Sequence, residues 1–559
     1  MRRLLALGGL LMAALPAPAD PATTAKAKAF VAAHTARFRP LDVAAGKAWW
    51  DANTTGKDED FKRKEAAQNT IDAALAEKAP FAELKALKAA TGQIDDPVLA
   101  RSIDVLYLLY LEKQVDPELL KKITAKSNAV EQAFNVARAK VDGQELTDSQ
   151  VREVLKNYTA SDRRKKVWEA SKVVGQTVEA DLKELVKLRN EAAKQLGFPN
   201  FHAMTLFLNE QDPAELLKLF DDLDMLTREP FLAAKTDIDE RLAAKMSVKP
   251  ADLMPWHYSD PFFQESPAVF DADLDAPFKT ADTLKLCRDF YSGIGLPIDD
   301  VIARSDLYEK KGKSPHAFCT DIDREGDVRV LANIVPNEYW MGTMLHELGH
   351  SVYSSKNIPE TVPYVLRGEA HILATEGVAM QFERFSKNGA WLAKMGVKVD
   401  DPMAFDATAK KVQRNQLLIF SRWCQVMLRF EQGMYENPSQ DLNKLWWSLV
   451  EKYQDLKTPP GREAPDYAAK IHICSAPVYY HNYQMGQLFA SQVHHTIAKE
   501  LYNGADPGTV LYIGDKRVGE FMTRKVFAPG RTLSWKGLAE FATGKPLGAA
   551  AFAADFRGK

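Results

Sequence analysis

The sequence predicts a mainly α-helical fold. Long stretches carry apolar residues three or four positions apart with charged residues between them, which is typical of helices that bury one face. Strand patterns are sparse, and no internal repeat, low-complexity region or long linker rich in Pro, Gly or Ser divides the chain. We therefore expect one large helical domain over residues 20–559, arranged as two lobes around a deep central cleft.

The helical pattern is clearest in the first half of the chain. It covers residues 57–92, 95–141, 148–197 and 212–246. Asp148 and Ser161 occupy positions where N-caps are expected. Asp212 followed by Pro213 has the order of a cap and a first helical residue.

One strand prediction stands apart from this helical pattern. Residues 328–335 read Val-Arg-Val-Leu-Ala-Asn-Ile-Val, and the turn sequence Asp-Arg-Glu-Gly-Asp precedes them at 323–327. Residues 316–322 are the expected hairpin partner. The sequence therefore predicts a small antiparallel sheet.

Charge composition argues against nucleic-acid binding. The chain has 73 basic and 75 acidic residues among 559, a formal net charge of -2. Proteins that bind nucleic acids usually have a basic excess or stripe. The 46% of hydrophobic residues supply a large core, and oligomeric state is not predicted.

The N-terminus has the features of a secretory signal peptide over residues 1–19. Arg2 and Arg3 precede an apolar run at 4–15, and the small residues at 17–19 suit a cleavage site. The run is too short to span a bilayer, and no other segment has a transmembrane pattern. We expect a secreted or periplasmic protein with no integral membrane segment in its mature chain.

The four cysteines are Cys287, Cys319, Cys424 and Cys474. Export permits disulfides, but four cysteines allow three complete pairings and their spacing does not choose among them. Free buried thiols are the alternative. No CxxC pair is present, so a cysteine metal site is not expected.

Residues His346-Glu347-Leu348-Gly349-His350 form an HExxH motif. Side chains four residues apart share one helix face, so both imidazoles can bind one ion and Glu347 lies beside its bound water. The flanking residues are apolar, which indicates a buried helix, and polar side chains on a buried helix cost free energy unless they have partners such as a metal ion. Imidazole ligands and a hydrolytic role favour Zn²⁺ with three protein ligands and one open position.

The third ligand has two main candidates. Glu369 follows His350 by 19 residues and Glu376 follows it by 26 residues. Spacing alone slightly favours Glu369, because thermolysin-like enzymes place their ligand at about that distance. His371 is a weaker candidate.

Several further segments occur in the order of a known family. Residues 48–54 read Ala-Trp-Trp-Asp-Ala-Asn-Thr, residues 188–193 read Leu-Arg-Asn-Glu-Ala-Ala, and residues 445–449 read Leu-Trp-Trp-Ser-Leu, followed by Lys-Tyr-Gln at 452–454 and Pro-Pro at 459–460. With the HExxH motif, these segments resemble the angiotensin-converting enzyme family, the peptidyl-dipeptidase A gluzincins. The resemblance runs from about residue 27 to the end.

The resemblance implies a choice of metal ligand. Thr375-Glu376-Gly377 matches the family segment that carries the third ligand, which implies His346, His350 and Glu376 as the zinc ligands. The family has an aspartate four residues later that orients a ligand histidine. Met380 stands there in this chain, so the support of the ligands must differ.

The resemblance also implies roles for a C-terminal group of residues. His472 and Tyr483 match residues that stabilise the tetrahedral oxyanion, and Lys470 and Tyr480 match residues that hold the substrate's C-terminal carboxylate. The alternative for these four residues is aromatic core packing with a surface lysine.

Other matches concern the substrate. His316 and Ala317 match a segment that hydrogen-bonds the substrate backbone, which agrees with strand addition beside the metal. Tyr258 replaces a glutamine that helps to hold the terminal carboxylate, and Asn482 replaces an arginine that binds an activating chloride.

Together these matches imply a zinc peptidase that releases C-terminal dipeptides from oligopeptides, with Glu347 as general base. A zinc oligoendopeptidase without a requirement for a free carboxylate is the nearest alternative. A non-catalytic zinc- or peptide-binding protein is a more distant one, because pseudoenzymes usually lose the base or a ligand. The natural substrate is not predicted.

Overall fold

The structure is a computed structural model that describes residues 19–270 and 273–556. The described residues are 69% helical, and their strands form two antiparallel sheets of two strands each. The prediction of a mainly α-helical fold is therefore confirmed. The expected signal peptide lies outside the described residues except for Ala19. Across the described ranges, no helix combines the length and the apolar character that crossing a bilayer requires.

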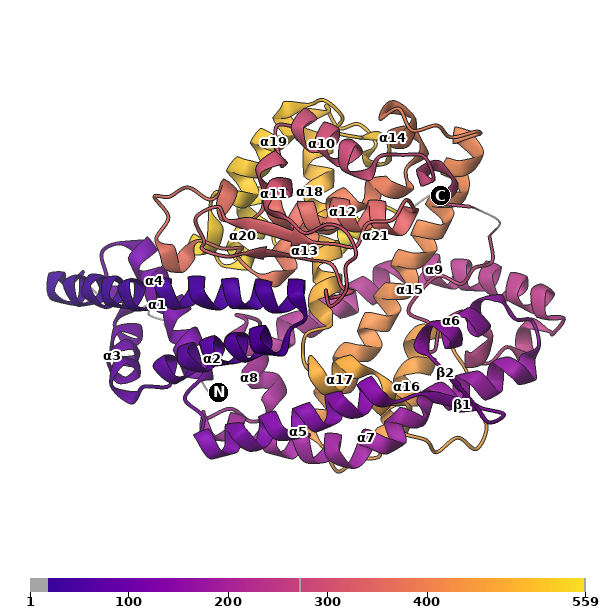
Figure 1. Ribbon diagram of the computed structural model, residues 1–559, viewed down its shortest axis with the longest axis horizontal. Coiled ribbons are helices and arrows are strands. Elements are labelled where there is room, and N and C mark those ends of the chain that lie inside the picture. The colour runs from indigo at the N-terminus through magenta and orange to yellow at the C-terminus, as the bar shows by residue number, and fades with distance from the viewer. Residues whose placement is uncertain (1–18, 271–272, 557–559) are drawn as a thin grey trace, which may run out of the picture.

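The first half of the chain consists of helices and one short hairpin. The helices are α1 (Pro21–Thr55), α2 (Asp58–Leu75), α3 (Lys78–Ala89), α4 (Pro97–Glu112), α5 (Pro117–Val136), α6 (Asp148–Asn157), α7 (Ser161–Gln195), α8 (Phe201–Leu208) and α9 (Pro213–Met246). The hairpin, which was not predicted, pairs β1 (Ala139–Val141) with β2 (Gln144–Leu146). Figure 1 shows α5 and α7 running side by side along one edge of the molecule.

The second half carries the HExxH helix and the second hairpin. Its elements are α10 (Thr283–Gly293), α11 (Asp299–Arg304), β3 (Phe318–Asp321), β4 (Val328–Leu331), α12 (Glu338–Val352), α13 (Ile372–Glu383), α14 (Gly389–Lys394), α15 (Pro402–Glu436), α16 (Leu442–Gln454), α17 (Ile471–Ser475), α18 (His481–Leu501), α19 (Lys516–Met522), α20 (Trp535–Thr543) and α21 (Ala550–Ala554). In Figure 1, β3 and β4 lie in the region of α12, which both strands contact.

Two predicted caps are wrong by one residue. Thr147, not Asp148, caps α6: its side chain accepts the N–H of Gln150, whose side chain accepts the N–H of Thr147 in return. This reciprocal capping box places Asp148 inside the helix. Ser161 is likewise the first residue of α7, and Ala160 occupies the cap position.

Caps and prolines also explain where the predicted helical stretches divide. Asp116 caps α5, and Pro117 is its first residue, so the stretch 95–141 breaks between α4 and α5. The prediction for Asp212 is confirmed, because its side chain accepts the N–H groups of Ala214 and Glu215 at the start of α9.

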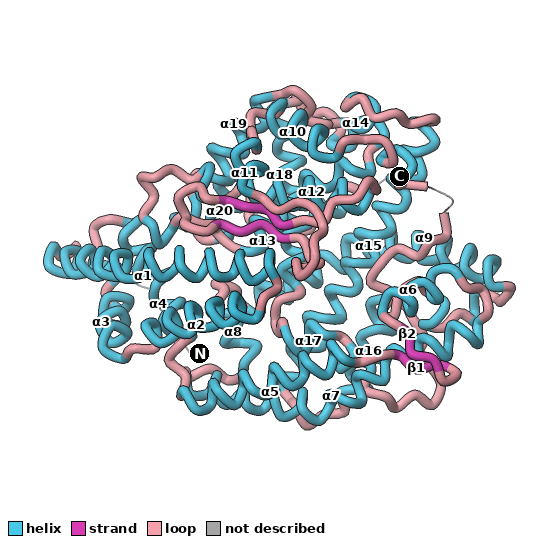
Figure 2. Tube along the Cα trace, in the orientation of Figure 1, coloured by secondary structure: helices cyan, strands magenta, loops and turns pink. Residues whose placement is uncertain are grey.

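The two largest groups of buried apolar side chains organise the molecule. The larger hydrophobic core extends from Val130 to Phe556 and includes apolar residues of α12, α13, α15 and α18. The smaller one joins α1–α4 to residues 358–366, which follow the HExxH helix, and so ties the N-terminal helices to that half. Figure 2 shows how far helices dominate both parts. The division into two lobes around a deep cleft stays a prediction.

The predicted sheet is confirmed. Phe318 of β3 lies opposite Leu331 of β4, and Asp321 lies opposite Val328. Both strands pack against α12. The four cysteines are free thiols, three of them buried and Cys319 partly buried.

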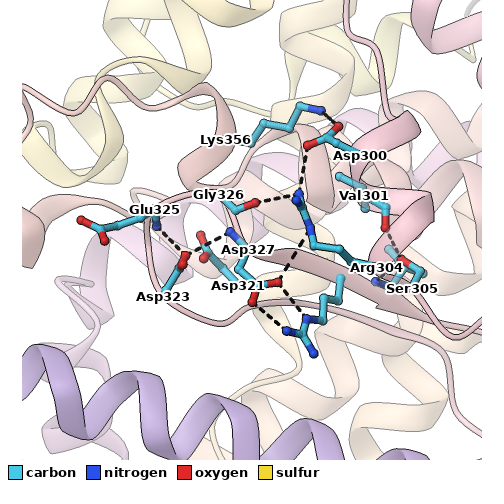
Figure 3. Close-up of polar contacts among 12 residues, drawn as sticks. Asp300, Val301, Arg304, Ser305, Asp321, Asp323, Glu325, Gly326, Asp327 and Lys356 are labelled. Atoms are coloured by element: carbon cyan, nitrogen blue, oxygen red, sulfur yellow. Dashed lines mark hydrogen bonds and ion pairs between the residues drawn. The ribbon is translucent and has the colours of Figure 1, made fainter.

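Polar contacts fix the turn between these strands (Figure 3). Oδ1 of Asp323 accepts the N–H groups of Glu325 and Asp327 at 2.8 and 3.0 Å, and Arg304 donates to the carbonyl oxygen of Gly326 at 2.8 Å. Lys356 and Arg304 both pair with Asp300. The segment after α12 is thereby tied to α11 and the hairpin.

Candidate metal centre and active site

The HExxH residues occupy the last turns of α12. Asn337 caps this helix by accepting the N–H of Trp340, and Met344, Leu345 and Leu348 are fully buried beneath it. The spacing of four residues turns His346 and His350 to the same side, where their Nε2 atoms lie 3.1 Å apart.

Glu376 of α13 completes a group of three metal-binding side chains. Its Oε2 lies 3.5 Å from Nε2 of His346, and the donor atoms of His346, His350 and Glu376 all lie within 4.8 Å of one another. Ligands of a tetrahedral zinc ion bound at about 2.1 Å lie about 3.4 Å apart. The two imidazoles and the carboxylate therefore suit zinc in both chemistry and spacing. Glu369 does not join this group, and Nδ1 of His371 instead accepts the N–H of Leu373 at the start of α13.

The other nitrogens of both histidines have partners of their own. Nδ1 of His346 donates to Oε2 of Glu383 at 2.8 Å, and Nδ1 of His350 lies 2.7 Å from Oγ1 of Thr375. These contacts leave both Nε2 atoms directed at the shared position. Sequence reasoning missed Glu383, because it looked for a carboxylate four residues after Glu376 and found Met380.

Burial and neighbouring charges set the ionisation of this site. Burial opposes protonation of His346, but hydrogen bonds with Glu376 and Glu383 hold its pKa well above the ordinary value. Burial lowers the pKa of His350 to about 4. Burial also raises the pKa of Glu347 to about 7, although the N–H of Cys319 in β3 donates to its carboxylate. The hairpin thus contacts the general-base candidate directly.

Glycines bring the helices of the site together. A Cβ on Gly349 would lie 2.8 Å from Cα of Ala379, so α12 and α13 approach backbone to backbone. A Cβ on Gly377 would lie 2.8 Å from the carbonyl oxygen of Gly486, and one on Gly486 would lie 3.1 Å from Cβ of Glu376. The absence of these side chains lets α13 lie directly between α12 and α18.

An aromatic group on and before α18 faces the proposed third ligand. Tyr479 and Tyr483 have ring centroids 5.3 Å apart, and the charge of Glu376 contributes to the raised pKa values of both, after burial. His472 stacks edge-on against Tyr480 at 5.0 Å, and Tyr480 lies 5.4 Å from Tyr483. The structure therefore brings His472, Tyr480 and Tyr483 into one cluster, to which it adds Tyr479.

Lys470 is buried beside this cluster. Only 7% of the residue is exposed, which does not fit the alternative of a surface lysine. Nζ donates to Oε1 of Gln264 at 2.7 Å and lies 5.3 Å from the ring centroids of Trp423 and Tyr480. Burial lowers the pKa of Lys470 to about 8. No acid lies within 4.0 Å of Nζ among the described residues, so this largely desolvated cation contacts an amide oxygen and aromatic rings but no carboxylate.

Two stretches of the chain match known peptidase families. Residues 21–228 match the family described as angiotensin-converting enzyme, and residues 302–556 match peptidase family M3. The two matches together support a gluzincin metallopeptidase that resembles the angiotensin-converting enzyme family. No curated protein matches the chain in sequence.

The candidate active site of this metallopeptidase lies in the second of the two matching stretches. The HExxH motif, Glu376 and the aromatic cluster all fall in the stretch that matches family M3. Met380 and Asn482, which depart from the angiotensin-converting enzyme pattern, fall there as well. Both families consist of zinc metallopeptidases.

Tyr258 of the metallopeptidase is engaged away from Lys470. Its hydroxyl donates to Oδ1 of Asp239 at 2.8 Å and accepts from Nζ of Lys235 at 2.7 Å. These three residues line a separate pocket of about 330 Å³. Gln264, six residues further along the chain, contacts the ammonium of Lys470 instead, and sequence reasoning missed it because it compared positions one by one.

The remaining predicted residues take different positions. His316 is exposed and Ala317 is partly buried, immediately before β3. Asn482 is buried, and its Oδ1 accepts from Nε2 of Gln211, whose Oε1 contacts Nε2 of His481. Asn482 is therefore part of a neutral hydrogen-bond network in the metallopeptidase.

Proposed function

We propose that this metallopeptidase is a zinc enzyme that releases dipeptides from the C-termini of oligopeptides. The observation that carries the proposal is the ammonium of Lys470, which is buried beside the aromatic cluster with an amide as its closest polar partner. A fixed cation at one end of a site favours substrates that end in a carboxylate.

The proposed zinc ligands are His346, His350 and Glu376, because they form the one group of three metal-binding side chains found among the described residues. When bound, zinc lowers the pKa of its water and polarises the scissile carbonyl. Glu347 follows the first ligand on α12. In this proposal its carboxylate accepts the proton of the attacking water and then donates it to the leaving amine.

Tyr483 and His472 are the proposed oxyanion partners. The hydroxyl of Tyr483 is near enough to Glu376 for that charge to affect its pKa. Burial and the charge of Lys470 lower the pKa of His472 to about 4, so its imidazole is neutral at neutral pH and keeps one N–H to donate. Donors placed at the developing negative oxygen stabilise the transition state more than the ground state.

Binding of the peptide completes the proposal. The carboxylate would be held by Lys470 and Tyr480, with Gln264 as a further donor through its amide nitrogen. The backbone next to the scissile bond would pair with the chain at His316, Ala317 and β3, as an added strand. Two residues would then lie between the scissile bond and the terminus, which sets the length of the product.

A pair of peptides tests this proposal. One oligopeptide has a free C-terminus, and its twin is amidated there. We expect the free acid to be cleaved to a dipeptide and the amide to be cleaved at least about a hundredfold more slowly in kcat/KM, because an unpaired buried cation must then be accommodated. Equal cleavage of both peptides would favour an oligoendopeptidase.

Lys470→Met provides the matching enzyme variant. It should reduce the preference for the free acid, mainly through KM, whereas Lys398→Met should leave the preference unchanged. The side chain of Lys398 is 88% exposed, so this control removes a charge without touching the cluster. A variant at Lys470 that keeps the full preference would contradict the assignment.

We also propose that the enzyme is exported and loses residues 1–19. Cleavage there would leave Asp20 as the first residue, and Asp20 caps α1 through the N–H groups of Ala22 and Thr23. The mass of the protein recovered from an export-competent host tests this, and an intact N-terminus would contradict it.

A further inference from the structure

A pocket of about 690 Å³ lies behind the C-terminal end of α13, outside the group of residues proposed for catalysis. It is formed where Arg384–Lys387 after α13, the first half of α15, His494 of α18, Pro507–Thr509 and the chain after α21 meet. Its volume is within the range of roughly 300–1,000 Å³ that is usual for small-molecule sites.

Arg414 of α15 lines this pocket without a partner. No ion pair or hydrogen bond connects its side chain to any other described residue, and its Nε is buried. Burial lowers the pKa of Arg414, in line with its lack of a compensating charge. The N–H of Nε is desolvated without a partner, which costs free energy, so the fold keeps a donor here that it does not itself use.

Arg384 is a second cation with unused donors. Its Nη1 is buried and has no hydrogen-bond partner among the described residues, and Nη2 lies 3.6 Å from Asp555. That carboxylate already accepts from Oγ of Ser491 at 3.0 Å and pairs with His495 at 2.7 Å. Arg384 therefore has only a shared and distant counter-charge.

The three lysines that line the pocket already have ion-pair partners, and Lys387 pairs with Glu338 at 2.8 Å. Lys410 pairs with Asp406, and Lys411 pairs with Asp237. The carboxylate of Asp506 accepts the N–H of Gly508. Among the cations that line the pocket, the two arginines are thus the ones with unsatisfied donors, while Asp506 forms no ion pair with any described residue.

Apolar side chains form other parts of the wall. Phe385 and Phe556 are buried, Val510 is buried, and Leu417 is partly buried. A fully hydrated inorganic ion would leave these surfaces without contacts. An apolar body with one charged end would cover them and reach the arginines.

We propose that this pocket binds a small organic acid: an oxyanion, carboxylate or phosphate, on an apolar body. The guanidinium groups of Arg414 and Arg384 hold the oxyanion, since their paired N–H groups match the oxygen geometry of both anions. Phe385, Leu417, Val510 and Phe556 contact the body. This ligand is separate from the peptide substrate, so the proposal does not depend on the proposed function.

Calorimetric titration of the full chain tests the proposal, with 4-phenylbutyrate as the probe at low ionic strength. We expect one molecule bound per chain. Its neutral twin, 4-phenylbutanamide, should bind at least about tenfold more weakly, because it cannot form the charge-assisted hydrogen bonds. Phenylpropyl phosphate should bind in the same site and compete with the carboxylate. Inorganic phosphate should bind more weakly than either organic acid.

Variants locate the bound acid. Arg414→Gln should weaken the binding of 4-phenylbutyrate by about tenfold or more. Arg414→Lys keeps the charge and should weaken this binding less. Lys398→Gln removes an exposed charge and should leave the affinity for 4-phenylbutyrate unchanged. Lys470→Met should also leave binding intact, which separates this pocket from the proposed carboxylate site. Thermal unfolding shows whether each variant is folded, and Arg384→Gln replaces Arg414→Gln if the latter is not.

Three results would overturn the proposal. The first is equal affinity for the acid and its amide, which would mean that the arginines take no part. The second is loss of binding in Lys470→Met rather than in the arginine variants, which would place the acid in the peptide site. The third is no binding of the two organic acids.

Discussion

Oε2 of Glu383 lies 2.8 Å from Nδ1 of His346, and a carboxylate at this distance fixes the hydrogen of the imidazole on Nδ1. Nε2, which faces His350 and Glu376, is then the nitrogen left to bind a metal. Glu383 follows Glu376 by seven residues, which is two turns on the same face of α13. One helix thereby supplies both a proposed ligand and the support of another ligand.

Glu383→Gln should weaken zinc binding by about ten- to a hundredfold. The amide keeps the size of the side chain but no longer provides a negative acceptor for Nδ1–H. Competition with a fluorescent chelator measures the affinity without relying on activity. Glu360→Gln, in an exposed loop, is the matched control. An unchanged affinity in Glu383→Gln would mean that the contact does not support the metal.

Glu347→Gln should reduce peptide hydrolysis by about a thousandfold or more while the protein keeps its zinc. The amide cannot accept the proton of the attacking water, yet Glu347 is not among the proposed ligands. Metal analysis and turnover are measured on the same preparation. Stoichiometric zinc in a wild-type protein that hydrolyses no peptide would instead support a binding protein.

Gly377→Ala should destabilise the protein by about 1–3 kcal/mol. The new Cβ would lie 2.8 Å from the carbonyl oxygen of Gly486 and from Cδ1 of Phe489, so α13 must move away from α18. Urea unfolding measures the loss. The control is Gly537→Ala in α20, where the nearest atom is 3.6 Å away and the change should be neutral or stabilising. Equal effects of both substitutions would show that the close approach is unimportant.

Glu431 should make stability fall as pH rises. Burial raises its pKa from 4.5 to about 8, and its Oε1 accepts the N–H of Val478 at 2.7 Å. Between about 4.5 and 8 the folded protein keeps this proton while the unfolded chain releases it, so the contribution is full below 4.5 and is lost as pH approaches 8. Glu431→Gln keeps the acceptor and removes the titration.

The measurement for Glu431 is the free energy of unfolding of wild type and Glu431→Gln at several pH values from 5 to 9. The difference between them should grow in favour of the variant as pH rises, by at most about 1.4 kcal/mol per pH unit. A difference that does not depend on pH would contradict a buried protonated Glu431.

Most of the fold could be predicted from the periodicity of apolar residues and from the residue types in turns. The spacing of apolar residues revealed the long helices, and the Asp–Gly turn at 323–327 revealed the β3–β4 hairpin. The sequence did not fix helix boundaries to the residue. Thr147 and Asp148 are both good N-cap residues for α6, and the structure identifies Thr147 through its reciprocal hydrogen bonds with Gln150. The β1–β2 hairpin has only three residues per strand, too few for an alternating pattern to emerge.

The residues of the candidate site were likewise predicted only in part. His346, His350 and Glu376 were recognised from a motif and a resemblance, and the fold brings them together. Gln264 and Glu383 were missed, since each acts from a position shifted along the chain from the place that the family pattern indicated. Whether a residue at a shifted position can take over a role depends on how the helices and loops pack against one another. Aligned motifs do not contain that information.

The metal centre is tested most directly by anomalous scattering at the zinc absorption edge from crystals of the zinc-loaded protein. We predict one strong peak between Nε2 of His346, Nε2 of His350 and the carboxylate of Glu376, at about 2.0–2.2 Å from each. A peak bound by Glu369 in place of Glu376, or no peak near these histidines, would contradict the account.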